Sequence, residues 1–136
     1  MRSPFCLIQE DCLPDEWLVL VCCILLNQTT RKQVDRVFRE FLMRWDTPQK
    51  LLHAEDDEIA HVLTHLGFQN RRVLHLKRMT EGYLACSWVH ASDLVGIGEY
   101  GNRCHQMMCR NVLGDEPPKD HALLQYYEWR KVHELL

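Results

Sequence analysis

Apolar residues recur every three or four positions along most of the chain, and this spacing constrains the fold more than any other sequence feature. No segment alternates between apolar and polar residues for long enough to predict a β-strand. The sequence therefore predicts an all-α protein in which each helix buries one apolar stripe. Its 136 residues suffice for a single domain over 1–136, or at most two small helical lobes that share a cleft.

Local signals predict where the first helices begin. Residues 16–26 are apolar on nearly every side of a helix, so we expect that helix at the centre of the core. Thr30 and Gln33 have the spacing of a capping box, which predicts the start of a second helix. Thr47 followed by Pro48 opens a short third helix, because proline suits the first helical position.

Similar signals divide the rest of the chain. The pattern predicts a helix from about Asp56 to Leu66 that ends at Gly67, and Asn70 is expected to cap the helix after it. Later in the chain, one helix is expected to run to about Leu113. After a turn-rich link, residues 120–136 are predicted to form a closing helix.

The longest apolar stretch, residues 17–26, is too short to span a bilayer, so no membrane partner is expected. The N-terminus lacks a basic segment followed by an apolar core, so we expect no secretory signal. A net charge of −3 argues mildly against nucleic acid as a partner. Basic residues nevertheless gather at 31–32 and 71–72, which leaves room for one basic face.

The seven cysteines include no C-x-x-C pair, and the eight histidines include no H-E-x-x-H pair. Cys22 and Cys23 lie in the most apolar helix, where cysteine behaves as a small apolar residue. We therefore predict reduced thiols in the core and assign no residue to a metal.

The residues Val95, Gly96, Ile97 and Gly98 form the most specific motif in the chain. They lie between a short helix that begins at 92–94 and a longer one, within a motif spanning about 92–112. Glycine allows a positive φ and lacks a β-carbon, so the backbone can come close to a phosphate. The amides that open the next helix favour an anion. The motif therefore predicts phosphate binding, although a tight turn with ordinary glycine caps remains the alternative.

Together with the glycine motif, two segments and one aspartate of this chain resemble a known protein superfamily. Residues 94–100 resemble the L-P-G-V-G-x-x hairpin of the endonuclease III superfamily of helix-hairpin-helix DNA glycosylases. Asp120, 22 residues after Gly98, lies close to where that superfamily has its essential aspartate, and it would also cap the final helix. Residues 25–30 are similar to the superfamily's L-S-A-Q-T-T segment, whose glutamine fills the gap left by a flipped base.

Within the superfamily, the chain resembles the glycosylase domains of the methyl-CpG-binding domain protein 4 family over essentially its whole length. The segments that carry this resemblance are 3–5, 7–10, 25–27 with Thr29, 65–68, 96–102 and 120–121 with Tyr126 or Tyr127 and Trp129. The resemblance implies helices in two lobes that flank a cleft. It also implies an enzyme of base excision repair that excises thymine or uracil mispaired with guanine in duplex DNA.

The resemblance also implies a role for individual residues. Asp120 and Tyr100 would be catalytic, and Gln9 and Tyr100 would form the base pocket. The residues implied in filling the space of the flipped base are Gln28, Leu66 and Phe68. Those implied in binding DNA phosphates are Thr30, Arg31, Val95, Gly96, Ile97 and Gly98.

Bifunctional relatives carry a lysine where this chain has Tyr100, so we expect base removal without lyase activity. No cysteine follows Cys109 within these residues, so the resemblance implies no iron–sulfur cluster and no cofactor. A monovalent cation held by hairpin carbonyls would be compatible with the fold. A monomer in the nucleus is expected.

Two positions depart from the family pattern: Gln28 replaces the usual arginine, and Ala122 replaces a lysine that commonly follows the Asp-His pair. Three alternatives also stay open at this point. The chain could be a glycosylase of another specificity, such as one for adenine opposite oxidised guanine. It could instead be a non-catalytic helix-hairpin-helix DNA-binding module, or a helical interaction protein with no nucleic acid partner.

Overall fold

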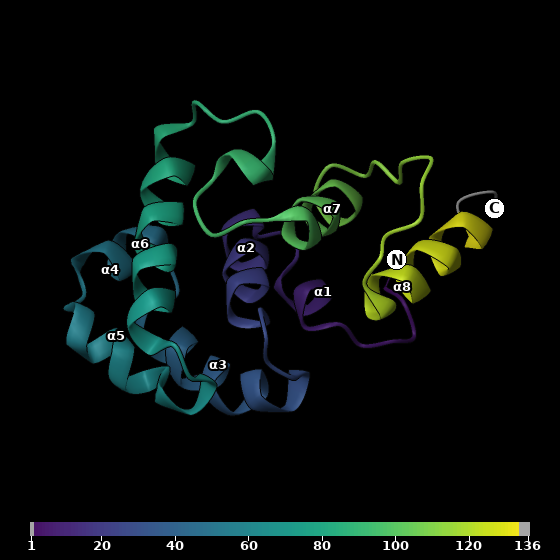
Figure 1. Ribbon diagram of the computed structural model, residues 1–136. Coiled ribbons are helices and arrows are strands. Elements are labelled where there is room, and N and C mark those ends of the chain that lie inside the picture. The colour runs from purple at the N-terminus through teal and green to yellow at the C-terminus, as the bar shows by residue number, and fades with distance from the viewer. Residues whose placement is uncertain (1, 134–136) are drawn as a thin grey trace.

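A computed structural model describes residues 2–133, and within that range the protein contains helices and no strand (Figure 1). The all-α prediction is therefore confirmed. The α-helices of this part of the chain are α1 (Ile8–Cys12), α2 (Glu16–Leu25), α3 (Arg31–Arg44), α4 (Pro48–His53), α5 (Asp56–Val62), α6 (Gln69–Ala85), α7 (Glu99–Met108) and α8 (His121–His133). Two short 3₁₀ helices, Thr64–Leu66 and Ala91–Asp93, connect them.

Helix α2 lies at the centre of the molecule, as its apolar composition predicts. It packs against α1, α6 and α7. Trp17, near the start, is 1% exposed, and every residue from Val19 to Leu25 is buried. An apolar side chain on every face gives each neighbouring helix something to pack against, which is why this helix organises the fold.

The other helices fall into two groups on either side of α2 (Figure 1). Helices α3 to α6 form one lobe, in which α6 packs along α4 and α5. Helices α1, α7 and α8 lie on the opposite side. The two-lobed arrangement places the segment after α2 and the segment before α7 at the junction between the lobes.

Several local predictions are confirmed in detail. The Thr30 hydroxyl accepts from the backbone N–H of Gln33 at 3.2 Å, and the Gln33 side chain accepts from the Thr30 N–H at 2.9 Å, which completes the capping box. Thr47 caps α4, with Pro48 at the first helical position. Gly67 ends the preceding 3₁₀ helix with a φ of 75°.

Three predicted boundaries are wrong. Asn70 does not cap α6, because the helix has already begun at Gln69, after Phe68 in a left-handed conformation. The helix predicted over 56–66 is divided into α5 and the 3₁₀ helix. Helix α7 ends at Met108 rather than near Leu113, since Asn111 turns the chain with a φ of 59°.

Helix α1 was not predicted, because its five residues are too few to show a periodicity. The final helix was predicted to reach residue 136, and residues 134–136 lie outside the described part of the chain. Cys22 and Cys23 are buried free thiols, as predicted. No helix among the described residues has both the length and the apolar character needed to cross a bilayer.

Candidate active site

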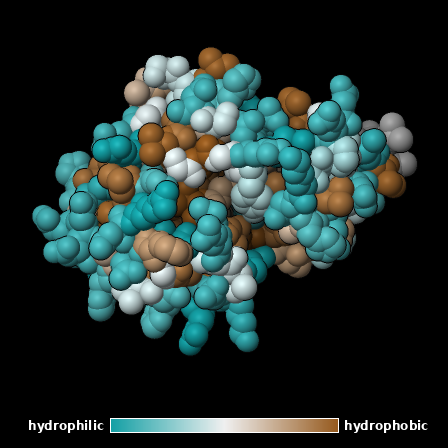
Figure 2. Space-filling model, viewed as in Figure 1, coloured by the Kyte–Doolittle hydropathy of each residue, from teal (hydrophilic) through white to brown (hydrophobic). Residues whose placement is uncertain are grey.

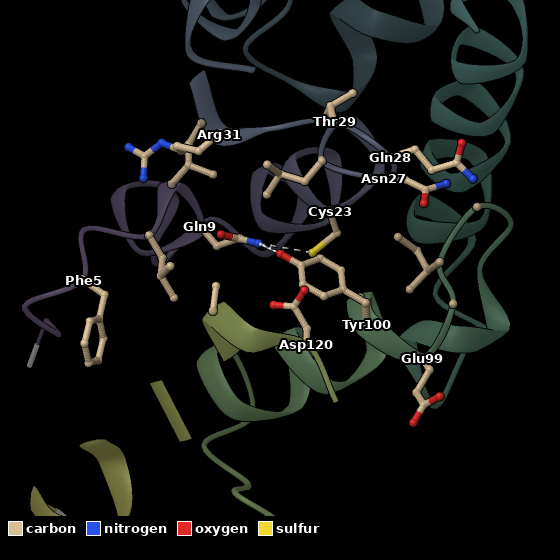
Figure 3. Close-up of a pocket in the computed structure, with 18 of the residues that line it drawn as sticks. Phe5, Gln9, Cys23, Asn27, Gln28, Thr29, Arg31, Glu99, Tyr100 and Asp120 are labelled. Carbon is tan, nitrogen blue, oxygen red and sulfur yellow. Dashed lines mark hydrogen bonds between the residues drawn. The ribbon is translucent and has the colours of Figure 1, made fainter. Parts of the chain in front are cut away.

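A pocket of about 750 Å³ opens where the two lobes meet. Figure 2 shows a hollow near the middle of this face, with hydrophobic residues visible between hydrophilic rims. The predicted site residues that line the pocket are Gln9, Gln28, Arg31, Gly96, Ile97, Gly98, Tyr100 and Asp120. They come from four separate segments of the chain, and the fold brings them together (Figure 3).

Gln9 and Tyr100 form a hydrogen-bonded pair in this pocket. Gln9 lies on α1 and is 2% exposed, and its Nε2 donates to the Tyr100 hydroxyl oxygen at 2.6 Å. Burial raises the pKa of Tyr100 far above its usual value, which keeps the phenol neutral at physiological pH. The phenol therefore keeps its own proton for donation to a ligand, and the carbonyl oxygen of Gln9 stays an acceptor.

The short helix that carries Gln9 is anchored by its neighbour, Glu10. The buried Glu10 carboxylate accepts from the backbone N–H of Ser3 at 2.7 Å and from the Ser3 hydroxyl. These charge-assisted bonds fix the N-terminal segment to α1. Phe5, in the same segment, then reaches the wall of the pocket. A five-residue helix thus keeps a defined position although it is too short to be stable alone.

Asp120 lies at the start of α8, on the side of the pocket facing the Gln9–Tyr100 pair (Figure 3). One carboxylate oxygen, Oδ2, accepts from the backbone N–H of Leu123 at 3.0 Å, so Asp120 caps the helix as predicted. This bond fixes the orientation of an otherwise exposed side chain. The carboxylate can therefore serve as a cap and still present its other oxygen to the pocket.

Of the two glycines in the hairpin before α7, the fold itself requires only Gly96. Gly96 has a φ of 87°, in a turn closed by a hydrogen bond from the Ile97 N–H to the Leu94 carbonyl at 3.2 Å. A β-carbon on Gly96 would also lie only 2.9 Å from Cβ of His75. Both the backbone conformation and the packing therefore require glycine at this position.

Gly98 differs from Gly96, because its backbone does not adopt the left-handed conformation. Its φ is −99°, and a β-carbon would have no atom within 4 Å. The protein's own fold therefore leaves room for a side chain at this position. The space that is left open lies directly in front of the first amides of α7, where an anion is favoured.

Gln28 lies in the segment after α2, and Phe68 lies directly before α6. Both are exposed and both have a left-handed backbone, with φ values of 58° and 49°. They line a second, smaller cavity of about 130 Å³. Non-glycine residues in this conformation are under strain, and such strain often accompanies a functional position. Leu66, in contrast, is only 5% exposed, because its side chain packs in the core, so the structure does not place it beside Gln28 and Phe68 at the surface.

One residue of the expected basic face has a structural role instead. Arg72 is 4% exposed, and its guanidinium donates to the carbonyls of Gly67 at 2.9 Å, Ile24 at 3.1 Å and Leu66 at 3.3 Å. It therefore joins the end of α2 to the turn before α6. Its neighbour Arg71 remains exposed beside the smaller cavity.

Thr30 and Arg31 lie at the start of α3. The Thr30 hydroxyl is used in the capping box, and the exposed Arg31 side chain lines the large pocket. Its Nε donates to Asp35 at 2.9 Å, and its guanidinium also contacts the Cys6 carbonyl. Arg31 is thus within reach of a ligand in the pocket, but such a contact would compete with its present partners.

Residues 21–127 match the model of the HhH-GPD superfamily of base excision DNA repair proteins. The chain belongs to this superfamily. The matched range includes the segment after α2, the hairpin and Asp120, and thus most of the pocket.

Similar proteins of this superfamily include a methyl-CpG-binding domain protein 4-like protein of Arabidopsis thaliana, 31% identical over 131 residues. That alignment covers 96% of this chain and 29% of the plant protein. A thymine-DNA glycosylase of Aeropyrum pernix is 36% identical over 93 residues, which are 63% of this chain and 42% of the archaeal protein. The chain thus spans less than half the length of either relative.

A solved structure of a thermostable thymine-DNA glycosylase matches with a TM-score of 0.70 and 21% identity, over 83% of this chain and 54% of that one. This likeness confirms the helix-hairpin-helix glycosylase fold.

The pocket of this superfamily member also contains residues to which the sequence assigned no role. Cys23 of α2 was expected to serve the core alone, but its sulfur lies 4.0 Å from Nε2 of Gln9 and borders the pocket. Phe5 lies in residues 3–5, one of the segments that carry the family resemblance, so the sequence did contain a signal that could have identified it as a pocket residue. No sequence signal would have identified Cys23, because its position in the pocket depends on the contact between α2 and α7.

Proposed function

We propose that this protein is a monofunctional DNA glycosylase that removes thymine or uracil mispaired with guanine from duplex DNA and leaves an abasic site. The observation that carries the proposal is the Gln9–Tyr100 pair and the Asp120 carboxylate in a single pocket. Relatives named thymine-DNA glycosylase and thymine/uracil-DNA glycosylase support this choice of base.

The pocket offers a flipped pyrimidine one acceptor and one donor. The Gln9 carbonyl oxygen would accept from N3–H of the base, and the neutral Tyr100 phenol would donate to an adjacent carbonyl oxygen. Thymine and uracil carry both groups side by side. A base that left either buried group unpaired would lose about 1–3 kcal/mol of binding energy.

Asp120 would stabilise the positive charge that develops on the sugar as the glycosidic bond breaks. The same carboxylate would orient and deprotonate the attacking water. Its fixed position at the start of α8 supports this role, because a preorganised charge costs no reorganisation during the reaction.

The target base must first leave the duplex, since it cannot be reached inside the stack. Gln28 and Phe68 are suited to fill the vacated space, because both protrude from a constrained backbone at the junction of the lobes. G·T and G·U pairs are easier to open than matched pairs, which would add to selectivity. A shorter side chain at position 28 than the family's arginine would penetrate the stack less deeply.

We further propose that the enzyme lacks lyase activity. A lyase needs an amine that can form a Schiff base with the sugar. Among the described residues that line the pocket there is no lysine, and Tyr100 stands at the position where bifunctional relatives carry one.

DNA phosphates would be held by the backbone of 95–98 and by the start of α3 at Thr30 and Arg31. The open space in front of Gly98 supports such a contact.

A monovalent cation bound by the hairpin carbonyls would affect DNA affinity alone. Replacing potassium with tetraethylammonium at constant ionic strength, and measuring DNA affinity, would test this. We also propose that the protein acts as a nuclear monomer.

A gel assay on labelled duplexes tests the proposed function. Duplexes with G·T, G·U, A opposite 8-oxoguanine and a perfect match are incubated with the protein and then treated with alkali or left untreated. We expect strand breaks only after alkali and only with G·T or G·U. Cleavage of the 8-oxoguanine duplex would favour the other specificity, and no cleavage would favour a DNA-binding module. Strand breaks without alkali would refute the absence of lyase activity.

A further inference from the structure

A second group of reactive side chains lies away from the pocket, at the far ends of the two helices that border it. The pocket is lined by the segment after α2 and by the first turn of α7. Glu16 begins α2, whereas His105 and Cys109 lie at the end of α7. Each helix has ten residues and is therefore about 15 Å long. The group is thus separate from the pocket by about one helix length.

The three side chains bring three potential metal ligands together. A carboxylate oxygen of Glu16, an imidazole nitrogen of His105 and Sγ of Cys109 all lie within 4.8 Å of one another. His105 and Cys109 are four residues apart, which places them on the same face of α7. Glu16 faces them from α2, and its Oε1 is 2.9 Å from Nε2 of His105.

We propose that Glu16, His105 and Cys109 bind a divalent cation of the zinc class. Carboxylate, imidazole and thiolate are all ligands that zinc accepts in proteins. Magnesium and calcium prefer oxygen ligands alone, so the sulfur and nitrogen argue against them. Three protein ligands leave a fourth position for water, and Glu16 and Cys109 are both partly exposed toward solvent.

The surroundings of His105 hold the site in place. His105 is 2% exposed, and the ring of Trp88 packs edge to face against its imidazole with 5.4 Å between ring centres. A metal ligand that is already oriented by packing loses little freedom when the ion binds. The contact between α2 and α7 brings the ligands together without a metal, through the bond between His105 and Glu16.

Arg110 is the group that a cation would have to displace. Its Nε lies 3.4 Å from the same Glu16 oxygen, but half of its side chain is exposed. Its guanidinium also lies over the Trp88 ring, 5.4 Å from the ring centre. Arg110 can therefore release Glu16 and keep its contact with Trp88, and a partly exposed ion pair of this kind contributes little stability.

A bound cation would connect α2 to α7 and stabilise the fold without touching DNA. Because metal that binds only the folded state raises stability by mass action, the effect can be measured without any assay of excision. Failure of this site and failure of the proposed glycosylase activity are therefore independent outcomes.

Cobalt(II) is the probe for the test, because a thiolate ligand gives it an intense near-ultraviolet charge-transfer band. The full chain is stripped of metal, kept reduced with a phosphine, and titrated with cobalt and then with zinc. We expect a thiolate band that saturates at one cobalt per chain and disappears when zinc is added. The absence of this band in the wild-type protein would overturn the proposal.

Cys109→Ser and Cys86→Ser form the matched pair of variants, since Cys86 is exposed and lies outside the group. Cys109→Ser should abolish the band and weaken zinc binding by at least about 10-fold, since loss of even an outer-shell partner of a metal ligand costs about 10- to 100-fold in affinity. Zinc should raise the Tm of the wild type and of Cys86→Ser but not of Cys109→Ser. A band that survives in Cys109→Ser, or that is lost in Cys86→Ser, would contradict the proposed site.

Discussion

Asp120 shows how one side chain can serve both the fold and the proposed reaction. Its Oδ2 caps α8 by accepting from the Leu123 N–H, while the side chain lines the pocket. An asparagine at this position would keep an oxygen for the cap but lose the negative charge. The two roles can therefore be separated by a single substitution.

We predict that Asp120→Asn lowers single-turnover excision from a G·U duplex by at least about 100-fold, because the developing positive charge loses its partner. DNA affinity and Tm should stay close to those of the wild type. Asp115→Asn is the matched control, since it removes an exposed acid from the same link without entering the pocket. Wild-type turnover in Asp120→Asn would disprove the catalytic role.

We predict that Tyr100→Phe reduces kcat/KM on a G·T duplex by roughly 10- to 100-fold, the kinetic equivalent of about 1–3 kcal/mol. It removes the donor for the base and leaves the buried Gln9 amide without its 2.6 Å partner. Tyr83→Phe, on the Trp88 side of the molecule, serves as control and should have no effect on excision. Steady-state kinetics on both variants would check this, and equal values would contradict the pocket assignment.

In the hairpin before α7, one glycine is required by the fold, whereas the other leaves space that a DNA phosphate could occupy. Gly96 is required by its φ of 87° and by contact with His75, whereas Gly98 has open space around it. The hairpin is held to α7 by close packing, since a β-carbon on Gly101 would come within 2.9 Å of Ile97. The presence of glycine at these two positions of the motif thus has two different physical explanations.

We predict opposite effects for alanine at the two hairpin glycines. Gly96→Ala should lower the free energy of unfolding by at least about 1 kcal/mol, because it combines a left-handed backbone with a steric clash. Gly98→Ala should leave that free energy unchanged but weaken DNA binding, since the new methyl group occupies the space of a phosphate. Urea denaturation and fluorescence anisotropy measure the two effects. Unchanged DNA affinity in Gly98→Ala would refute the phosphate contact.

At the scale of the whole molecule, two adjacent arginines have different roles. Arg72 is buried and joins α2 to the turn before α6 through three carbonyl groups. Arg71 is exposed beside Phe68 and Gln28 at the smaller cavity. Arg72 therefore holds the lobe of α3 to α6 against the central helix α2, and Arg71 contributes positive charge to the face where DNA is proposed to bind.

We predict that Arg72→Met destabilises the protein by about 3 kcal/mol or more, because it leaves buried carbonyls without donors. Arg71→Ala should leave stability unchanged and reduce the salt dependence of DNA binding by about one unit of the log–log slope, as for loss of one phosphate contact. Thermal denaturation and binding at several salt concentrations check both. A stable Arg72→Met variant would contradict the structural role.

Features that depend on neighbouring residues could be predicted from the sequence alone. The helical period of α2 and α3, the capping box at Thr30 and the stop at Gly67 were all predicted correctly. Each arises from contacts within about four residues, which a local pattern records directly. The resemblance to known glycosylases also pointed to Gln9, Tyr100 and Asp120, which line one pocket.

Contacts between residues far apart in the sequence could be seen only in the folded protein. Gln9 and Tyr100 are 91 positions apart, so no local pattern could reveal their hydrogen bond. The same holds for His105 and Glu16, 89 positions apart, and for the burial of Leu66 and Arg72. The side of a helix that becomes buried depends on what packs against it, and that is a property of the assembled core.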